Sequence, residues 1–77
     1  MIRIEMENND FERVYGNELG DLSDYISIEV TYSEEEKTIA IWGQKRGVSV
    51  LLQDEIEDEV GIFQELLKLA FEVETEE

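Results

Sequence analysis

A chain of 77 residues with a net charge of −15 and 42% hydrophobic residues is long enough for one small domain, residues 1–77. It contains neither Cys nor His, which excludes disulfides, thiolate nucleophiles, imidazole bases and the usual zinc ligand sets. Because its 21 acidic residues outnumber its 6 basic ones, direct binding to nucleic acid or to an anionic membrane is disfavoured.

The sequence lacks the features of an exported or membrane-spanning chain. No stretch approaches the ~20 apolar residues of a membrane span, and charges begin at Arg3 where a secretory signal would be apolar. We therefore expect a cytoplasmic protein. High net charge is also typical of disordered chains, but here the hydrophobic residues recur in periodic blocks, which predicts a folded domain.

The first quarter of the chain mixes one clear strand with less regular segments. Residues 2–6 alternate apolar and polar, which predicts a half-buried strand with inward residues Ile2, Ile4 and Met6. Residues 7–10 have the composition of a turn. Residues 11–15 fit either a second strand or a short helical turn, and residues 16–24, with two Gly, predict a loop that crosses the domain.

Three further strands follow in the middle of the chain. Residues 25–33 alternate strictly, and their inward side chains would be Ile26, Ile28, Val30 and Tyr32. After an acidic turn, residues 37–42 return with Ile39 and Ile41 inward, and residues 48–52 follow a second turn. Successive hairpins of this kind predict an antiparallel β-meander with one covered face, within a sheet of four to five strands.

The cover is expected to be a C-terminal helix over residues 54 to about 73. Asp54 and Glu57 have the spacing of a capping box, and acids in the first turn suit the helix dipole. An apolar stripe at helical spacing would face the sheet and comprises Ile56, Val60, Phe63, Leu66, Leu67, Ala70 and Phe71. The predicted fold class is therefore α+β: a small antiparallel sheet covered on one face by a C-terminal helix.

The opposite face of this expected helix is acidic. Asp54, Asp58, Glu65 and Glu72 fall within about 40° of one another on a helical wheel, with Glu57 alongside. Such a face can simply be solvated. It can also bind a basic protein surface, and the near absence of Lys or Arg on it favours that hypothesis.

A second apolar group lies outside the stripe. Ile62, Leu69 and Val73 share a flank of the expected helix, beside a mid-helix Gly61. This flank is either covered by the 16–24 loop or the N-terminal strand, or it is exposed and forms a homodimer or partner contact.

The adjacent bases Lys45 and Arg46 are expected at the tip of a hairpin whose turn begins at Trp42. They are either a solvated turn that neutralises nearby acids, or part of the rim of a partner interface, because Arg and Trp are favoured interface anchors.

No constellation in the sequence indicates catalysis or a cofactor. It has no nucleophile beside a base, no phosphate-binding loop and no calcium loop. The carboxylate runs at 33–36 and 54–59 can bind Ca²⁺ or Mg²⁺ only weakly and without a designed site. We expect a non-enzyme with no catalytic residue, no metal and no cofactor.

In size and charge the chain resembles small phage-borne inhibitors of restriction, repair or CRISPR enzymes, which occupy the basic nucleic-acid groove of their target. The resemblance implies an anti-defence protein that mimics nucleic acid and binds a basic surface of a nucleic-acid-binding protein. Its expected binding residues are Asp54, Glu57, Asp58, Glu65 and Glu72. The alternative is a non-catalytic interaction or assembly module, including a homodimer, whose acidity serves only solubility.

Overall fold

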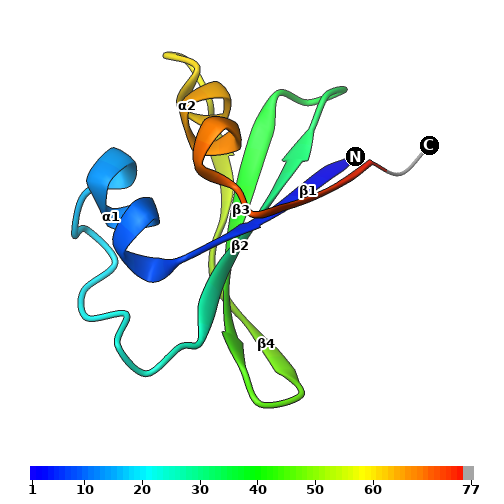
Figure 1. Ribbon diagram of the computed structural model, residues 1–77. Coiled ribbons are helices and arrows are strands. Elements are labelled where there is room, and N and C mark those ends of the chain that lie inside the picture. The colour runs from blue at the N-terminus through cyan, green and yellow to red at the C-terminus, as the bar shows by residue number, and fades with distance from the viewer. Residues whose placement is uncertain (76–77) are drawn as a thin grey trace.

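Five strands and two helices make up residues 1–75, the part of the chain that the computed structural model describes (Figure 1). In chain order they are β1 (Ile2–Met6), α1 (Asn8–Tyr15), β2 (Ser27–Ser33), β3 (Thr38–Lys45), β4 (Val48–Glu57), α2 (Ile62–Leu69) and β5 (Glu72–Thr75). The strands form one antiparallel sheet in the order β4-β3-β2-β1-β5. The expected α+β class and the β-meander are thus confirmed.

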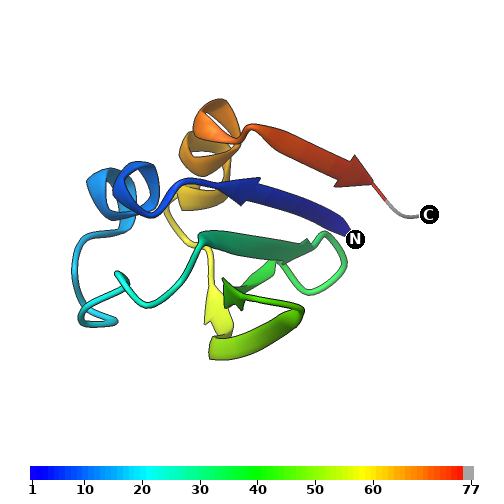
Figure 2. The same ribbon diagram turned by 60° about the horizontal axis from the view of Figure 1, so that its bottom comes forward.

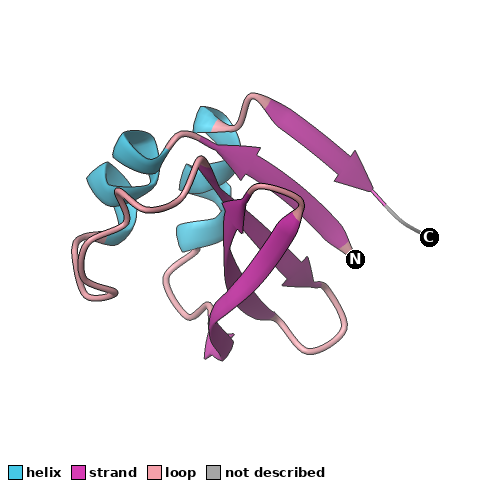
Figure 3. Ribbon diagram, turned by 90° about the horizontal axis from the view of Figure 1, so that it is seen from below, coloured by secondary structure: helices cyan, strands magenta, loops and turns pink. Residues whose placement is uncertain are grey.

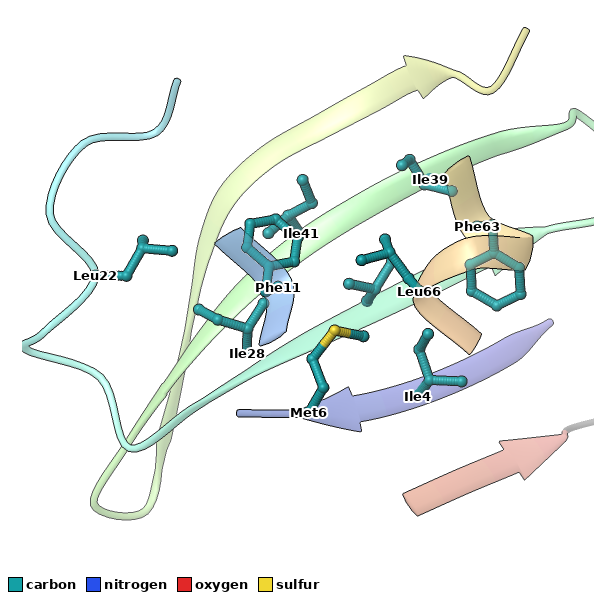
Figure 4. Packing of buried hydrophobic residues seen from close by; sticks show 10 residues of the cluster. Ile4, Met6, Phe11, Leu22, Ile28, Ile39, Ile41, Phe63 and Leu66 are labelled. Atoms are coloured by element: carbon teal, nitrogen blue, oxygen red, sulfur yellow. The ribbon is translucent and has the colours of Figure 1, made fainter. Parts of the chain in front are cut away.

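The core lies between one face of the sheet and the two helices. Ile4 is paired with Val30 and Val30 with Ile41, so the alternating residues of β1, β2 and β3 point to the same side. Phe11 from α1 and Phe63 from α2 pack against these side chains. The buried cluster in Figure 4 comprises Ile4, Met6, Phe11, Leu22, Ile28, Val30, Ile39, Ile41, Phe63 and Leu66. Burial of each such side chain stabilises the fold by about 1.5–3 kcal/mol.

The segment after β1 forms a helix, which settles the choice left open for residues 11–15. Helix α1 begins directly after Glu7, and the Phe11 amide donates to the Glu7 carbonyl at 3.0 Å. The turn expected at 7–10 is therefore wrong, because these residues supply the first turn of the helix. Helix α1 packs against α2 on the same side of the sheet (Figure 2), and Figure 3 shows the pair from below.

The connection from α1 to β2 contains no helix or strand, as expected, but it is held in place. The Asn8 side-chain amide donates to the carbonyl oxygens of Leu22 and Tyr25 at 2.7 and 2.8 Å. Leu22 inserts into the core. The ring of Tyr25 lies over Gly43, where a Cβ atom would come within 2.5 Å of Tyr25 Cδ1. Ile26 was expected inward, but it precedes β2 and is 69% exposed.

The long C-terminal helix is the main error of the sequence-based prediction. Helix α2 covers only Ile62–Leu69. The preceding residues extend β4 to Glu57, and Ile56 is paired with Ile39. Gly61 adopts φ +77° immediately before α2 and so begins the helix instead of lying inside it. Strand pairing provides backbone hydrogen bonds for residues 56–57 and 72–75 that a solvated helix end would lack.

The expected helix stripe is correct only within and close to α2. Phe63 and Leu66 are buried, and Ile56, Leu67 and Ala70 pack against the core. Val60 and Phe71 are 81% and 60% exposed because they lie outside the helix, where helical spacing does not apply.

The capping residue of α2 also differs from the prediction. The Asp58 carboxylate accepts hydrogen bonds from the backbone amides of Ile62 at 2.7 Å and Phe63 at 3.2 Å. Asp54 lies within β4 and has no place in the cap. A carboxylate at the first turn satisfies free amides and interacts favourably with the helix dipole.

Ile62, Leu69 and Val73 do not share the flank of one helix. Ile62 packs against the core and Leu69 is half-buried, whereas Val73 is 51% exposed on β5. The prediction fails because Val73 belongs to a strand at the sheet edge and not to the helix. Neither described helix is long and apolar enough to cross a membrane.

Candidate functional site

Two acidic segments that are separate in the sequence meet at one end of the sheet. The turn between β2 and β3 lies beside the end of β4: Thr38 is paired with Glu57, and the Asp58 amide donates to the Lys37 carbonyl at 3.2 Å. Figure 1 shows both segments at the top of the molecule. We call this end the acidic pole. It comprises Glu34, Glu35, Glu36, Asp54, Glu55, Glu57, Asp58 and Glu59.

The acidic pole is open to solvent. Each of its side chains is exposed except Asp58, which is half-buried because its carboxylate caps α2. Lys37 is the one base within its two segments. A shallow hollow of about 410 Å³ lies between the segments, lined by Glu36, Lys37, Glu57, Asp58 and Glu59. So many like charges in one place project a negative potential that attracts cationic surfaces.

The five expected binding residues are divided among different elements. Asp54, Glu57 and Asp58 belong to the acidic pole. Glu65 is on α2, where Lys68 Nζ lies 3.6 Å from its carboxylate. Glu72 is on β5, at the opposite edge of the sheet. Their expected alignment on one helix face is therefore wrong, because residues 54–58 and 72 are not helical.

The second notable surface is the face of the sheet that the helices leave uncovered. Arg3 bridges two carboxylates there, with Nε 2.6 Å from Glu29 Oε1 and Nη2 3.1 Å from Glu74 Oε2. The Gln44 side-chain amide donates to the other oxygen of Glu29. Glu29 is only 7% exposed, and this burial raises its pKa above the usual glutamate value. The network spans β5, β1, β2 and β3.

Trp42 lies on this uncovered face, within β3, and not at the start of the hairpin turn as expected. It is paired with Glu29 on one side and Leu51 on the other, and its indole N–H donates to Thr31 Oγ1 at 3.4 Å. A hollow of about 290 Å³ on one side of Trp42 is lined by Met1, Arg3, Glu29, Thr31 and Ser49. A second, of about 390 Å³, extends from Trp42 to Glu36, Asp54 and Glu55 of the acidic pole.

The basic tip lies at the other end of the molecule. Lys45 and Arg46 sit at the β3–β4 turn, at the bottom of Figure 1. Lys45 Nζ is 5.3 Å from the centroid of the Tyr25 ring. Both bases line a shallow hollow with the exposed apolar side chains Ile26 and Val48. The protein therefore has an acidic end and a small basic end.

The sequence-based prediction missed two features of this site. The sequence shows the acidic runs at 33–36 and 54–59, but the predicted helix from residue 54 gave no reason to expect them side by side. The Arg3–Glu29 pair depends on strand register, which no local pattern of this sequence specifies.

Within residues 1–75, no group of three or more Asp or Glu side chains is arranged to hold a metal ion. Comparisons of the chain with protein-family models, with curated proteins and with solved structures give no match.

Proposed function

We propose that this chain is a non-catalytic cytoplasmic inhibitor that mimics nucleic acid and occupies the basic groove of a nucleic-acid-binding protein. The restriction and CRISPR enzymes that phage anti-defence proteins inhibit are the class of target that fits its size and charge. The acidic pole, which includes Asp54, Glu57 and Asp58, is the proposed contact surface.

The observation that carries the proposal is the convergence of two acidic segments on one end of the fold. A chain that needed acids only for solubility could distribute them evenly and avoid mutual repulsion. Here the β2–β3 turn and the end of β4 are brought to the same place with Lys37 as their one base. Closely spaced carboxylates on a folded scaffold resemble a phosphate backbone in charge. The Lys and Arg side chains of a nucleic-acid-binding protein can therefore bind them.

The test begins with a pull-down from cell lysate at low and then moderate salt, followed by mass identification of the eluted proteins. Each candidate is then titrated with this protein in the presence of the candidate's own nucleic acid. A mimic should compete with the nucleic acid and lose affinity steeply as salt rises. Simultaneous binding of both ligands would exclude occupation of the groove.

Two variants with the same net charge locate the surface. The first reverses Glu34, Glu35 and Glu59 to Lys in the acidic pole, and the second reverses Glu18, Glu65 and Glu72 to Lys elsewhere. The proposal expects a much larger loss of affinity from the first, because close charge pairs contribute 1 kcal/mol or more when desolvated. Equal losses would show that only overall charge matters, and circular dichroism verifies that both variants fold.

One observation favours a second candidate, an assembly module. The exposed side chains of Ile26 and Val48 lie together beside the basic tip. Exposed apolar clusters of this kind can mark interfaces between protein copies. Light scattering at micromolar concentration distinguishes the two candidates: a dimer that Val48→Asp converts to a monomer supports assembly, and a monomeric wild type excludes it.

A further inference from the structure

The uncovered face of the sheet carries a hollow of about 390 Å³ that opens towards the acidic pole. Its walls come from three neighbouring strands, one turn and Met1, which precedes β1. Trp42 and Ala40 belong to β3, Thr31 to β2, Glu36 to the β2–β3 turn, and Asp54 and Glu55 to β4. Its volume is within the range of pockets that bury a ligand group, and neither helix covers this side of the sheet.

The charged side chains that line the hollow are all acidic. Glu36, Asp54 and Glu55 contribute carboxylates, and no Lys or Arg side chain of the described residues lines the hollow. Arg3, the base on this face, lines the hollow on the other side of Trp42, where Glu29 and Glu74 bind its guanidinium. Among the described residues, the three carboxylates therefore meet no basic side chain at this position, and Met1, which carries the N-terminal ammonium, is the one lining residue that bears a positive charge.

The inner wall supplies an aromatic ring in a fixed position. The hydrogen bond from the Trp42 indole to Thr31 Oγ1, at 3.4 Å, joins the ring to the adjacent strand. Both residues lie in the middle of the sheet, on β3 and β2, where backbone pairing on both sides restricts movement. A rigid indole beside carboxylates suits a planar cation, which is attracted to the ring and donates N–H groups to the oxygens.

We infer that this hollow receives an arginine side chain from a basic segment of the partner, with its guanidinium against Trp42 and its N–H groups directed to Asp54 and Glu55. This inference rests on the proposed function, since it takes the partner surface to be basic, and it names the group that anchors it. Arginine fits better than lysine because its planar guanidinium can contact a ring and two carboxylates at once, whereas an ammonium is a strongly hydrated point charge.

The binding test uses Trp42 as its own reporter, because it is the single tryptophan of the chain. An acetylated and amidated hexa-arginine peptide is titrated into the protein while the indole emission is recorded. Peptides of six lysines and of six citrullines serve as controls; citrulline keeps the shape of arginine without its charge. We expect a saturable change in emission with arginine, at least threefold weaker binding of lysine and no change with citrulline.

Two outcomes of this titration would overturn the inference. One is arginine binding, seen by anisotropy of a labelled peptide, without a change in the Trp42 emission. The other is a lysine peptide that binds and alters the emission as strongly as the arginine peptide, because the site would then recognise charge alone.

A matched pair of variants separates the hollow from the rest of the acidic pole. Asp54→Asn with Glu55→Gln removes two charges from the hollow, and Glu57→Gln with Glu59→Gln removes two charges from the same pole outside it. We expect at least a tenfold loss of hexa-arginine affinity in the first variant and about a twofold loss in the second. Both pairs are exposed, so both variants should fold.

The same measurements distinguish failure of the inference from failure of the proposed function. Similar losses in the two variants would overturn the arginine site, while the acidic pole would still attract a basic partner. Absence of any loss in both, together with undiminished binding of the identified partner, would overturn both the arginine site and the nucleic-acid mimic.

Discussion

Arg3 and Glu29 form an ion pair across β1 and β2, with Nε and Oε1 2.6 Å apart, although Glu29 is 7% exposed. A buried carboxylate that loses its cation is left uncompensated, so removal of Arg3 should destabilise the fold more than removal of a base that contacts no buried carboxylate. The pair also gives the uncovered face a defined chemistry, because it neutralises the hollow on one side of Trp42.

Glu29 should make stability depend on pH. Burial raises its pKa; Arg3 opposes this increase, and Glu5 and Glu74 add to it. A carboxyl whose pKa is raised on folding contributes stability that is fully present below its unfolded pKa and is lost as pH rises through its folded pKa. The wild type should therefore gain stability relative to Glu29→Gln, which cannot titrate, as pH falls from 7 to about 4.

Urea unfolding midpoints of both proteins at several pH values test this expectation. The same comparison with Glu18→Gln, which removes a charge from the exposed loop, shows how much of the trend comes from overall charge. A stability difference between wild type and Glu29→Gln that stays constant over the range contradicts the assignment.

Two phenylalanines of the C-terminal region should respond very differently to truncation. Phe63 is 2% exposed and stacks on Tyr32 with ring centroids 4.6 Å apart, whereas Phe71 is 60% exposed. We expect Phe63→Ala to cost about 3–5 kcal/mol, enough to unfold most of so small a domain. Phe71→Ala should change the unfolding free energy by about 0.5 kcal/mol or less. Thermal melts of both variants test this difference in stability. Equal melting temperatures would contradict the placement of α2.

The cap of α2 gives a prediction that separates the observed structure from a longer helix. Asp58→Ala should lose about 0.5–2 kcal/mol, because the amides of Ile62 and Phe63 lose their acceptor. Asp54→Ala should leave helix stability unchanged, since Asp54 is on β4. Chemical denaturation measures both, and a larger cost at Asp54 would favour a helix that begins there.

Asn8 should control the order of the loop between α1 and β2. Its side-chain amide is the donor to the carbonyls of Leu22 and Tyr25, so Asn8→Ala should cost about 1–3 kcal/mol. Asn9→Ala, at the exposed neighbouring position, is the matched control. Amide hydrogen exchange should show faster exchange in residues 20–26 of the first variant alone, and unchanged protection there would mean that Leu22 holds the loop without help.

Strands β1, β2 and β3 were predictable because the alternation of apolar and polar residues that specifies a strand is a local pattern in the sequence. Alternation in β1, β2 and β3 places Ile4, Val30 and Ile41 on one face, and short turns force β2 to pair with β3 and β3 with β4. The C-terminal third was not predictable in the same way. Acids and apolar residues there satisfy a helical period as well as a strand period, and glutamate favours helices. Pairing with β3 and β1 decides between the two, and these contacts are distant in sequence.

The candidate site was predictable in its chemistry but not in its place. The acidic runs at 33–36 and 54–59, and three of the five expected binding residues, belong to the acidic pole. Their meeting depends on β4 continuing to Glu57, which follows from register with Thr38 and not from composition. The position of Trp42 beside these acids depends on the same register.

The pairing of β1 with β5 has a consequence for synthesis. Ile2 is opposite Thr75, so β1 waits for β5, which is synthesised much later, before both its edges are paired. At about 5–20 residues per second, that wait lasts roughly 4–14 s, longer than most small domains need to fold. An open strand edge on many nascent copies invites intermolecular pairing. The excess of acidic over basic residues already present in residues 1–71 makes those copies repel one another during this interval, so the acidity protects the nascent chain from intermolecular pairing.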